Sequence, residues 1–293
     1  MDVSIVIRTK DEADFIGDTL ARISEQDFCG KYEVVIVDSG SSDGTLDAVK
    51  KYDVRPISID SRKFTYGRAL NIGAECSNGE FIVNLSAHAL PVDGSWLTNL
   101  LSGFGDHSTA GTYGRQLSNG HLNPFEALKN DQFFGEEALR FSMKQDKMLK
   151  GIRFSNSNSA IRKQTWRRFR FDEHLPWAED MLWQQEVIEN GFSVIYVPSA
   201  AVYHTHKVCV RDAYKDSKHC AYALASMTGK RQAIPLIAYD VAILTGSMPN
   251  AMWQNLKYIW QNNYLRHLKI TPLYVLCVWF GWLLGRAEYR TKR

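Results

Sequence analysis

The chain has 293 residues, of which 45% are hydrophobic and 23% are charged, so it is long enough for one large globular domain with an appendage. Its net charge of +3 is too small to indicate nucleic acid as a partner, and no nucleic-acid-binding motif accompanies it. Five cysteines without CxxC spacing predict a reducing compartment rather than a disulfide framework. The first residues, MDVSIVIRTKDEADF, enter a strand pattern at once and carry no basic n-region or cleavage site, so we expect no secretory signal.

The first 60 residues alternate between strand and helix patterns. Residues 3–8 (VSIVIR) and 32–38 (YEVVIVD) are β-branched runs typical of buried parallel strands, and a shorter strand is expected within 54–60. This βαβ order predicts an α/β fold with a Rossmann-like mixed sheet flanked by helices, in which ligands bind beyond the carboxyl ends of the strands. Asp38 and the SGSSDG loop are therefore where a nucleotide should lie. The absence of a GxGxxG motif argues against a nicotinamide enzyme.

The next segment adds a second group of polar residues after a strand. Gly67 and Arg68 open a helical pattern, and the arginine offers a forked cation to a diphosphate. Residues 80–85 (EFIVNL) form an apolar run expected to be a central strand, and it ends in the sequence SAHALP. The polar triplet that begins with Ser86 is where a metal-diphosphate site is expected.

A pair of carboxylates, Glu179 and Asp180, stands where a loop containing a proline gives way to the helical pattern MLWQQEVIEN. Acids at a helix start can act as caps for unpaired backbone N–H groups, which is the structural interpretation. We favour a general base instead, because the following strand pattern, 192–198, delivers His204 and His206 close in sequence. A loop carboxylate beside imidazoles is a polar cluster that a purely structural element rarely needs.

These motifs together resemble a known family. The matching segments are IVIRTKDEADFI, VVIVDSGSSDGT, FTYGRALNIGAE, SNSNSAIRKQTW, FDEHLPWAED and AAVYHTHKVCVRDAY. In their order and spacing they resemble an inverting glycosyltransferase of family 2, most of all the rhamnosyltransferase-like members that build bacterial surface polysaccharides. The resemblance implies the GT-A nucleotide-sugar-binding fold, with a catalytic domain over residues 1–210.

The resemblance also implies roles for individual residues. Asp180 matches the acid that removes the acceptor hydroxyl proton, with Glu179 beside it. Trp177 is expected to stack on an acceptor ring, with packing as the alternative. The remaining matches are to the donor site: Thr9, Glu12 and Asp38 for base and ribose, Arg68 and Asn71 near the diphosphate, and Ser86, Asn156 and Ser157 around the phosphates and sugar.

The polar run from Ser155 to Ser159 has two interpretations. One is turn and N-cap chemistry before a helix at 161–169, which we expect for Ser159. The other is that Asn156 and Ser157 line the pocket for the donor sugar. Both remain open.

The SAHALP sequence departs from the family, whose members carry an aspartate-containing motif such as TQDALP at this strand end. His88 occupies the aspartate position, and Mg²⁺ prefers oxygen ligands, so the usual magnesium expectation is weakened. Imidazoles from His88, His204 and His206 would select an ion such as Mn²⁺ or Zn²⁺ instead. Of the two later histidines, we expect His206 to point into the site and His204 to support it. The alternative is a metal-free site in which arginines and loop amides neutralise the diphosphate.

After about residue 210 the sequence predicts helices, and residues 211–293 are expected to form a helical region for membrane attachment. Residues 270–285 are an apolar run shorter than the ~20 residues of a spanning helix. Basic flanks that include Arg286, together with Trp279 and Trp282, fit a helix in the interface of an anionic leaflet. The alternative is packing on the catalytic domain or on a second subunit in a homo-oligomer.

The sequence therefore predicts a cytoplasmic enzyme, peripheral on the inner face of the cell membrane. It would transfer a sugar with inversion from dTDP-rhamnose or a UDP-hexose to a lipid-linked or polysaccharide acceptor, with Mn²⁺ or Mg²⁺ as the candidate cofactor. Two other classes remain: a non-catalytic nucleotide-sugar or glycan-binding protein of the same fold, and a nucleotidyltransferase. The first loop, RTKDEAD, lacks the glycine-rich sequence expected of the latter.

Overall fold

The computed structural model describes residues 1–143, 154–229 and 248–291. Residues 230–247 of the region expected to be helical lie outside these residues. The chain divides into two compact units, which are described separately. The first consists of Met1–Leu117, Asp131–Leu175 and Glu179–His204, and the second contains the remaining segments.

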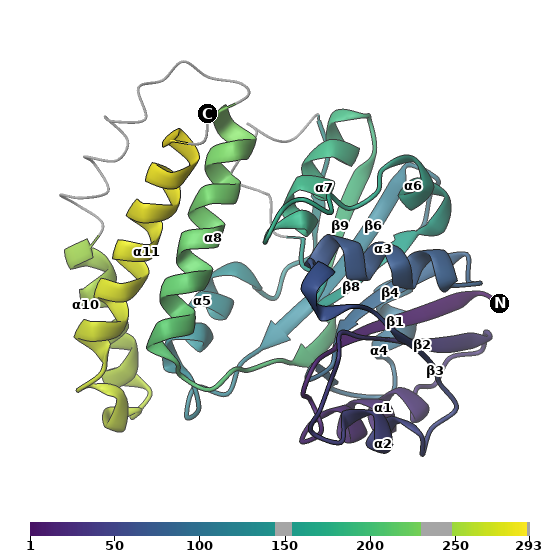
Figure 1. Cartoon of the computed structure of the whole chain (residues 1–293), viewed down its shortest axis with the longest axis horizontal. Helices are drawn as coiled ribbons and strands as arrows, with labels where there is room; N and C mark the ends of the chain where they lie inside the picture. Colours follow the sequence, from purple (N-terminus) through teal and green to yellow (C-terminus); the bar gives the residue numbers. More distant parts are fainter. Residues whose placement is uncertain (144–153, 230–247, 292–293) are drawn as a thin grey trace. The chain divides into compact units, whose positions relative to one another are not determined.

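The first unit is built on a mixed sheet (Figure 1). The strand order is β3-β2-β1-β4-β8-β6-β9-β5, with β7 paired to β9. Strands β1, β2, β3 and β4 are mutually parallel, β8 is antiparallel to both β4 and β6, and β6 runs parallel to β9. The strands are β1 (Val3–Thr9), β2 (Tyr32–Asp38), β3 (Arg55–Ser58), β4 (Phe81–Ser86), β5 (Leu90–Pro91), β6 (Thr109–Leu117), β7 (Leu139–Phe141), β8 (Asn158–Arg162) and β9 (Ser193–Tyr203).

Helices cover both faces of this sheet, and each face has its own apolar core. On one face Ile5 and Ile7 of β1 pack with residues of α1, α2 and α4. On the other face Val6 packs with residues of α3, α6 and α7. The helices of the first unit are α1 (Ile16–Ser24), α2 (Thr45–Val49), α3 (Tyr66–Cys76), α4 (Trp96–Ser102), α6 (Lys163–Arg168) and α7 (Glu179–Glu189).

The strands and helices expected from the apolar runs are confirmed for β1, β2, β3, β4, α1, α2, α3 and α7. Because side chains alternate across a strand, Ile5 and Ile7 face one core while Val6 faces the other, which explains why β1 is apolar throughout. The prediction of an α/β fold with a Rossmann-like mixed sheet flanked by helices is therefore correct.

The prediction that Ser159 caps a helix is wrong. Ser159 is fully buried inside β8, and the residue preceding α6 is Arg162, which makes no side-chain cap. The polar sequence of β8 is stable in the interior because its side chains are hydrogen-bonded: Asn158 Oδ1 accepts from Trp96 Nε1 at 2.9 Å, and Asn158 Nδ2 donates to the Ala200 carbonyl at 2.8 Å.

The second unit contains a long helix pair, α8 (Val210–Gly229) and α11 (Thr271–Thr291), together with α10 (Met248–Gln261) and part of α5 (Pro124–Phe133). Gly281 and Gly285 allow α11 to lie directly against α8, because a Cβ at Gly285 would stand 2.0 Å from the Lys218 carbonyl oxygen. Among the described residues, none of the helices combines the length and the apolar character that crossing a bilayer requires.

One residue expected at a membrane surface, Arg286, is placed differently. Arg286 is only 8% exposed, and its guanidinium lies 4.5 Å from the centre of the Trp282 ring. Arg286 was predicted as a basic flank for an anionic leaflet, and this prediction is wrong because the cation is covered within the unit. The exposed aromatic residues of these helices are instead Trp253, Trp260 and Phe280.

Candidate active site

The polar residues predicted from separate loops come together at the carboxyl ends of the parallel strands. In the registers of β1 with β2 and β4, Thr9 pairs with Asp38 and Arg8 with Ser86. The ends of these three strands therefore lie level, as expected for the ligand-binding edge of such a sheet.

Asp180 lies in the first turn of α7 and is held by two backbone groups. Its Oδ2 accepts from the Asn156 N–H at 3.2 Å, and its Oδ1 accepts from the Met181 N–H at 2.8 Å. The residue before the helix, Ala178, has a φ of 67°, a left-handed conformation that is uncommon for a residue other than glycine. The carboxylate is therefore oriented by the chain around it.

Burial, together with the neighbouring Glu179 carboxylate, raises the pKa of Asp180 to about 7. The two backbone N–H groups and the positive charge of Arg8 act in the opposite direction. A carboxyl group with a pKa near 7 is poised to accept a proton at neutral pH, which is the property a general base needs.

A chain of buried amides connects the two carboxylates to the sheet. Asn156 Nδ2 donates to Glu179 Oε1 at 3.3 Å, while Asn156 Oδ1 accepts from Asn84 Nδ2 and from the Ser159 hydroxyl, each at 3.1 Å. Asn156 is 1% exposed and Glu179 is 5% exposed. Both residues were predicted as site residues, and both lie beside Asp180 as parts of its support.

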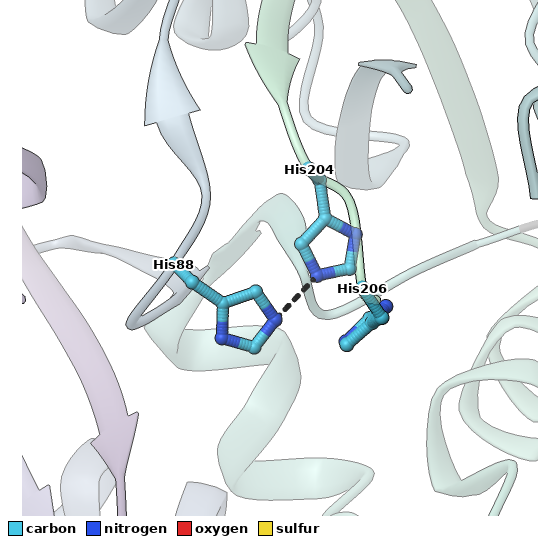
Figure 2. A group of neighbouring side chains, drawn as sticks. All are labelled: His88, His204 and His206. Carbon is cyan, nitrogen blue, oxygen red and sulfur yellow. Dashed lines mark hydrogen bonds between the residues drawn. The ribbon is translucent and has the colours of Figure 1, made fainter. Parts of the chain in front are cut away.

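A pair of histidines forms the second polar group, shown in Figure 2. Nε2 of His88 and Nε2 of His204 lie 3.1 Å apart, and the two rings stack with their planes 8° from parallel. Nδ1 of His88 lies 2.9 Å from Glu12 Oε1, and Nδ1 of His204 lies 2.9 Å from Gln116 Oε1. Each ring is therefore anchored at its outer nitrogen.

These anchors determine where the ring protons sit. A carboxylate oxygen and an amide oxygen only accept hydrogen bonds, so Nδ1 carries the proton in both His88 and His204. The Nε2 atoms face each other at hydrogen-bonding distance, an arrangement that also suits two ligands of one cation. Anchoring by Glu12 and Gln116 is also the arrangement by which metal-binding histidines are usually oriented.

The prediction that His206 acts directly and that His204 supports it stays a prediction. In the structure the imidazole of His204 contacts that of His88. His206 follows two residues later and is assigned to the second unit. There its Nδ1 lies 2.8 Å from Glu126 Oε1, and its backbone N–H donates to the same carboxylate. The side chain of His206 is 54% exposed.

The predicted donor-binding residues at the ends of β1 and β2, Thr9 and Asp38, differ in their hydrogen bonding. The carboxylate of Asp38 accepts from the Gly40 and Ser41 N–H groups and from the Ser41 hydroxyl, so it shapes its own loop. Gly40 there has a φ of 87°, a conformation that favours glycine. The Thr9 hydroxyl is buried and has no hydrogen-bond partner among the described residues.

Arg68 and Asn71, predicted near the diphosphate, belong to a closed network with Glu173. Asn71 Nδ2 donates to Glu173 Oε1 and to the Phe171 carbonyl, and its Oδ1 accepts from Trp166 Nε1 and the Phe171 N–H. This uses all four hydrogen bonds that an asparagine side chain can make. Arg68 Nη1 pairs with Glu173 Oε2 at 3.2 Å. Both side chains therefore hold the loop before α7.

The remaining predicted residues are Ser86, Ser157 and Trp177. The Ser86 N–H donates to the Ser157 carbonyl at 3.1 Å, which joins the end of β4 to the loop before β8. The Ser86 hydroxyl lies 3.5 Å from His88 Nε2. Trp177 lies in the short segment Pro176–Ala178, which is assigned to the second unit.

Four residues of this site were not anticipated from the sequence: Arg8, Asn84, Gln116 and Glu173. Arg8 carried a usable signal, because a charged residue at the end of an otherwise apolar buried strand needs a reason to be there. Gln116 and Glu173 carried none, since their partners are 88 and 102 residues away.

A groove of about 480 Å³ lies elsewhere, at the amino ends of β1, β2 and β3, where Tyr32, Glu33 and Arg55 line it. It is at the opposite edge of the sheet from Asp180 and the histidine pair, so it is not part of this site.

The fold is the GT-A fold of nucleotide-sugar-dependent glycosyltransferases. Mannosyltransferase PcManGT from Pyrobaculum calidifontis, in complex with GDP-Man and Mn²⁺, superposes with a TM-score of 0.62 at 19% identity, covering 96% of this chain and 86% of that one. S. aureus TarS 1-349 in complex with UDP superposes with a TM-score of 0.58 at 17% identity, covering 100% and 92%. The family model Glycosyl transferase family 2 matches residues 4–175, more than half of the chain. The chain therefore belongs to glycosyl transferase family 2 and is an inverting glycosyltransferase.

Two curated relatives are rhamnosyltransferases. O-antigen chain rhamnosyltransferase RfbN of Salmonella typhimurium is 28% identical over 222 residues, which cover 73% of this chain and 70% of the relative. O-antigen chain rhamnosyltransferase WbaN of Salmonella anatum is 30% identical over 187 residues, which cover 62% and 59%. The predicted resemblance to rhamnosyltransferase-like members of the family is thus confirmed.

Proposed function

We propose that this enzyme transfers a sugar from dTDP-rhamnose or a UDP-hexose to a hydroxyl of a lipid-linked or polysaccharide acceptor, with Asp180 as the general base. The observation that carries the proposal is the oriented Asp180 carboxyl group with its pKa raised to about 7. The relatives named for O-antigen rhamnosyl transfer support the sugar and the acceptor class.

The reaction is a single displacement at the anomeric carbon. The Asp180 carboxylate takes the proton of the acceptor hydroxyl as the acceptor oxygen bonds to the anomeric carbon. The bond from that carbon to the β-phosphate oxygen breaks, and its electron pair leaves with the nucleoside diphosphate. Proton removal by a positioned base contributes ~10²–10⁴-fold to such a step. Asn156 and Met181 keep the carboxylate oriented through their N–H groups.

The test is the substitution Asp180→Asn, which preserves shape and removes the base. We expect transfer to fall by ~10²–10⁴-fold while binding of the nucleotide sugar is retained. Asp172→Asn, on the nearby loop, is the matched control and should keep near-normal transfer. Near-normal transfer by Asp180→Asn would refute the assignment of Asp180 as the base. Donor binding without any transfer by the wild type would instead favour a binding protein that shares the fold.

A divalent ion fits the histidine pair. The two Nε2 atoms of His88 and His204 converge at 3.1 Å with their outer nitrogens anchored, and imidazoles suit Mn²⁺ or Zn²⁺ better than Mg²⁺. His206 is a candidate third ligand because only Thr205 separates it from His204. A bound ion would neutralise charge on the departing diphosphate. We favour Mn²⁺, which accompanies GDP-Man in the mannosyltransferase complex.

Chelation tests this part of the proposal. Removal of metal should abolish transfer, and Mn²⁺ should restore it. Activity that is indifferent to a chelator would instead support the metal-free site.

We also propose that the second unit attaches the enzyme to an anionic membrane. Leu273, Leu276, Phe280 and Leu284 form one exposed stripe along α11, since they recur at helical spacing. Trp253 and Trp260 are 66% and 71% exposed on α10, and the exposed cations Lys257, Arg266 and Lys269 lie on α10 and the segment that follows it. Apolar and aromatic groups beside cations favour an interface with acidic lipids.

Flotation with vesicles tests the attachment. The wild type should bind vesicles that contain phosphatidylglycerol and bind pure phosphatidylcholine vesicles weakly. Replacing Trp253 and Trp260 by serine should weaken binding, whereas Leu139→Ser, on β7, should not. Concentration-dependent dimerisation without vesicle binding would show that this surface packs on a second copy instead.

A further inference from the structure

Arg8 is the last residue but one of β1, the strand at the centre of the parallel part of the sheet. Its position in the register is level with Ser86 on β4, two residues before His88. Side chains alternate across a strand, so Arg8 shares a face with Val6, which packs against α3 and α7. This is the face on which Asp180 begins α7.

The contacts of Arg8 agree with this placement. Its guanidinium carbon lies 4.9 Å from the centre of the Tyr66 ring, at the start of α3. The positive charge also acts on the Asp180 carboxylate. Arg8 is thus fixed between α3 and the catalytic base by a cation–π contact rather than by an ion pair.

The hydrogen-bonding capacity of Arg8 is not used by the described part of the chain. Its Nε is buried and has no hydrogen-bond partner there. None of the ion pairs formed among the described residues includes Arg8, whereas Arg68 is paired with Glu173. A buried N–H donor without a partner is costly, and an anion that binds beside a half-buried guanidinium would satisfy it.

We propose that Arg8, rather than Arg68, binds the β-phosphate of the nucleotide donor and stabilises it as it leaves. The proposal rests on the proposed function, because the anion it invokes is the diphosphate of a nucleotide sugar. The β-phosphate is the group bonded to the sugar, and it is the phosphate that must lie nearest the face shared with Asp180. An arginine fork pairs with two phosphate oxygens, which a lysine cannot reproduce.

The experiment compares nucleoside diphosphates with monophosphates, since only the former contain a β-phosphate. Wild-type protein with Mn²⁺ is first screened against UDP, dTDP and GDP for protection from thermal unfolding. The diphosphate that stabilises it, and the matching monophosphate, are then titrated by calorimetry into the wild type, Arg8→Met and Arg68→Met.

We expect Arg8→Met to lower the affinity for the diphosphate by ~10–100-fold and the affinity for the monophosphate by less than about threefold. Arg68→Met should change both by less than about threefold. Equal affinity of Arg8→Met and the wild type for the diphosphate would overturn the assignment, and so would an equal loss for the two nucleotides, which indicates a disturbed site.

Arg8→Lys keeps the charge and decides the question if Arg8→Met does not fold. A selective loss of about threefold or more for the diphosphate supports the assignment, and unchanged affinity overturns it. Failure of the wild type to bind any of the three diphosphates would instead overturn the proposed function itself, and this assignment with it.

Discussion

Two polar clusters lie on the same face of the sheet, and they differ in how completely their hydrogen bonds are satisfied. The Asn71 cluster, made of Asn71, Arg68, Glu173 and Trp166, uses every donor and acceptor of its central asparagine. The Asp180 cluster, made of Asp180, Glu179, Asn156, Asn84 and Arg8, does not.

In the Asp180 cluster, Asn84 Oδ1 and Arg8 Nε are buried with no hydrogen-bond partner among the described residues, and the pKa of Asp180 is raised to about 7. Buried polar atoms without hydrogen-bond partners lower the stability of a protein, and they are retained where a bound ligand supplies the missing partner. The comparison teaches that a predicted site residue should be judged by the hydrogen-bonding and ion-pairing capacity that the fold leaves unused. Asn71 has no hydrogen-bonding capacity left and Arg68 is paired with Glu173, whereas Arg8 Nε has no partner among the described residues.

The largest expected effect is on the pH dependence of catalysis. Because the pKa of Asp180 is raised to about 7, the carboxyl group is protonated below that pH and cannot act as a base. We expect kcat/KM to fall about tenfold per pH unit below 7, about 100-fold at pH 5, and to level off above 7. The residual rate of Asp180→Asn should be flat over this range. A fall of the same slope in Asp180→Asn would assign the titration to another group.

The histidine pair should show the next largest effect. His88→Ala removes one of the two converging nitrogens, and we expect activity and Mn²⁺ affinity to fall by ~10–100-fold. Gln116→Leu removes only the anchor of His204, so a smaller loss of ~10-fold is expected. The exposed His107 provides the control, His107→Ala, which should behave as wild type. Metal titrations and initial rates measure both quantities.

Asn71→Ala tests the satisfied cluster. It leaves Trp166 Nε1 and the Phe171 backbone without their partner, and we expect the free energy of unfolding to fall by about 2–4 kcal/mol. The folded fraction should keep diphosphate affinity within about threefold of wild type. Urea denaturation measures the stability, and calorimetry measures the affinity. A selective loss of diphosphate affinity would instead support the predicted donor-binding role of Asn71.

The smallest expected effects are changes in the free energy of unfolding, and they should have opposite signs for substitutions in the two clusters. Glu173→Gln weakens the pairing with Arg68 and should lower the free energy of unfolding by about 1 kcal/mol. Asp180→Asn should raise the free energy of unfolding at pH 8.

The sign for Asp180 follows from its two pKa values, 3.8 as the ordinary value and about 7 in the folded protein. The preference of the fold for the neutral acid stabilises the protein below about pH 4, and this contribution is lost as the pH rises to 7. Asparagine is neutral throughout, so it avoids the loss. Equal thermal midpoints for the wild type and Asp180→Asn at pH 8 would contradict the contrast between the clusters.

Local patterns predicted much of the first unit. The apolar runs of β1, β2 and β4 were recognised because a central parallel strand is buried on both faces. The strand β8 was not recognised, because Asn158 and Ser159 resemble turn residues in isolation. Only the partners Trp96 and Ala200, distant in sequence, make burial of Asn158 favourable.

The sequence by itself determined which chemical groups the site contains: a carboxylate pair at a helix start, histidines in place of the usual aspartate, and polar residues after successive strands. Only the tertiary structure decided which of these groups contact one another and which are left to bind a substrate. His88 and His204, 116 positions apart, meet across the strand ends, and Glu173 reaches back to neutralise Arg68. Hydrogen bonds and ion pairs are short-range, so a polar side chain is either used by the fold or left for a substrate according to neighbours that the chain supplies only when folded.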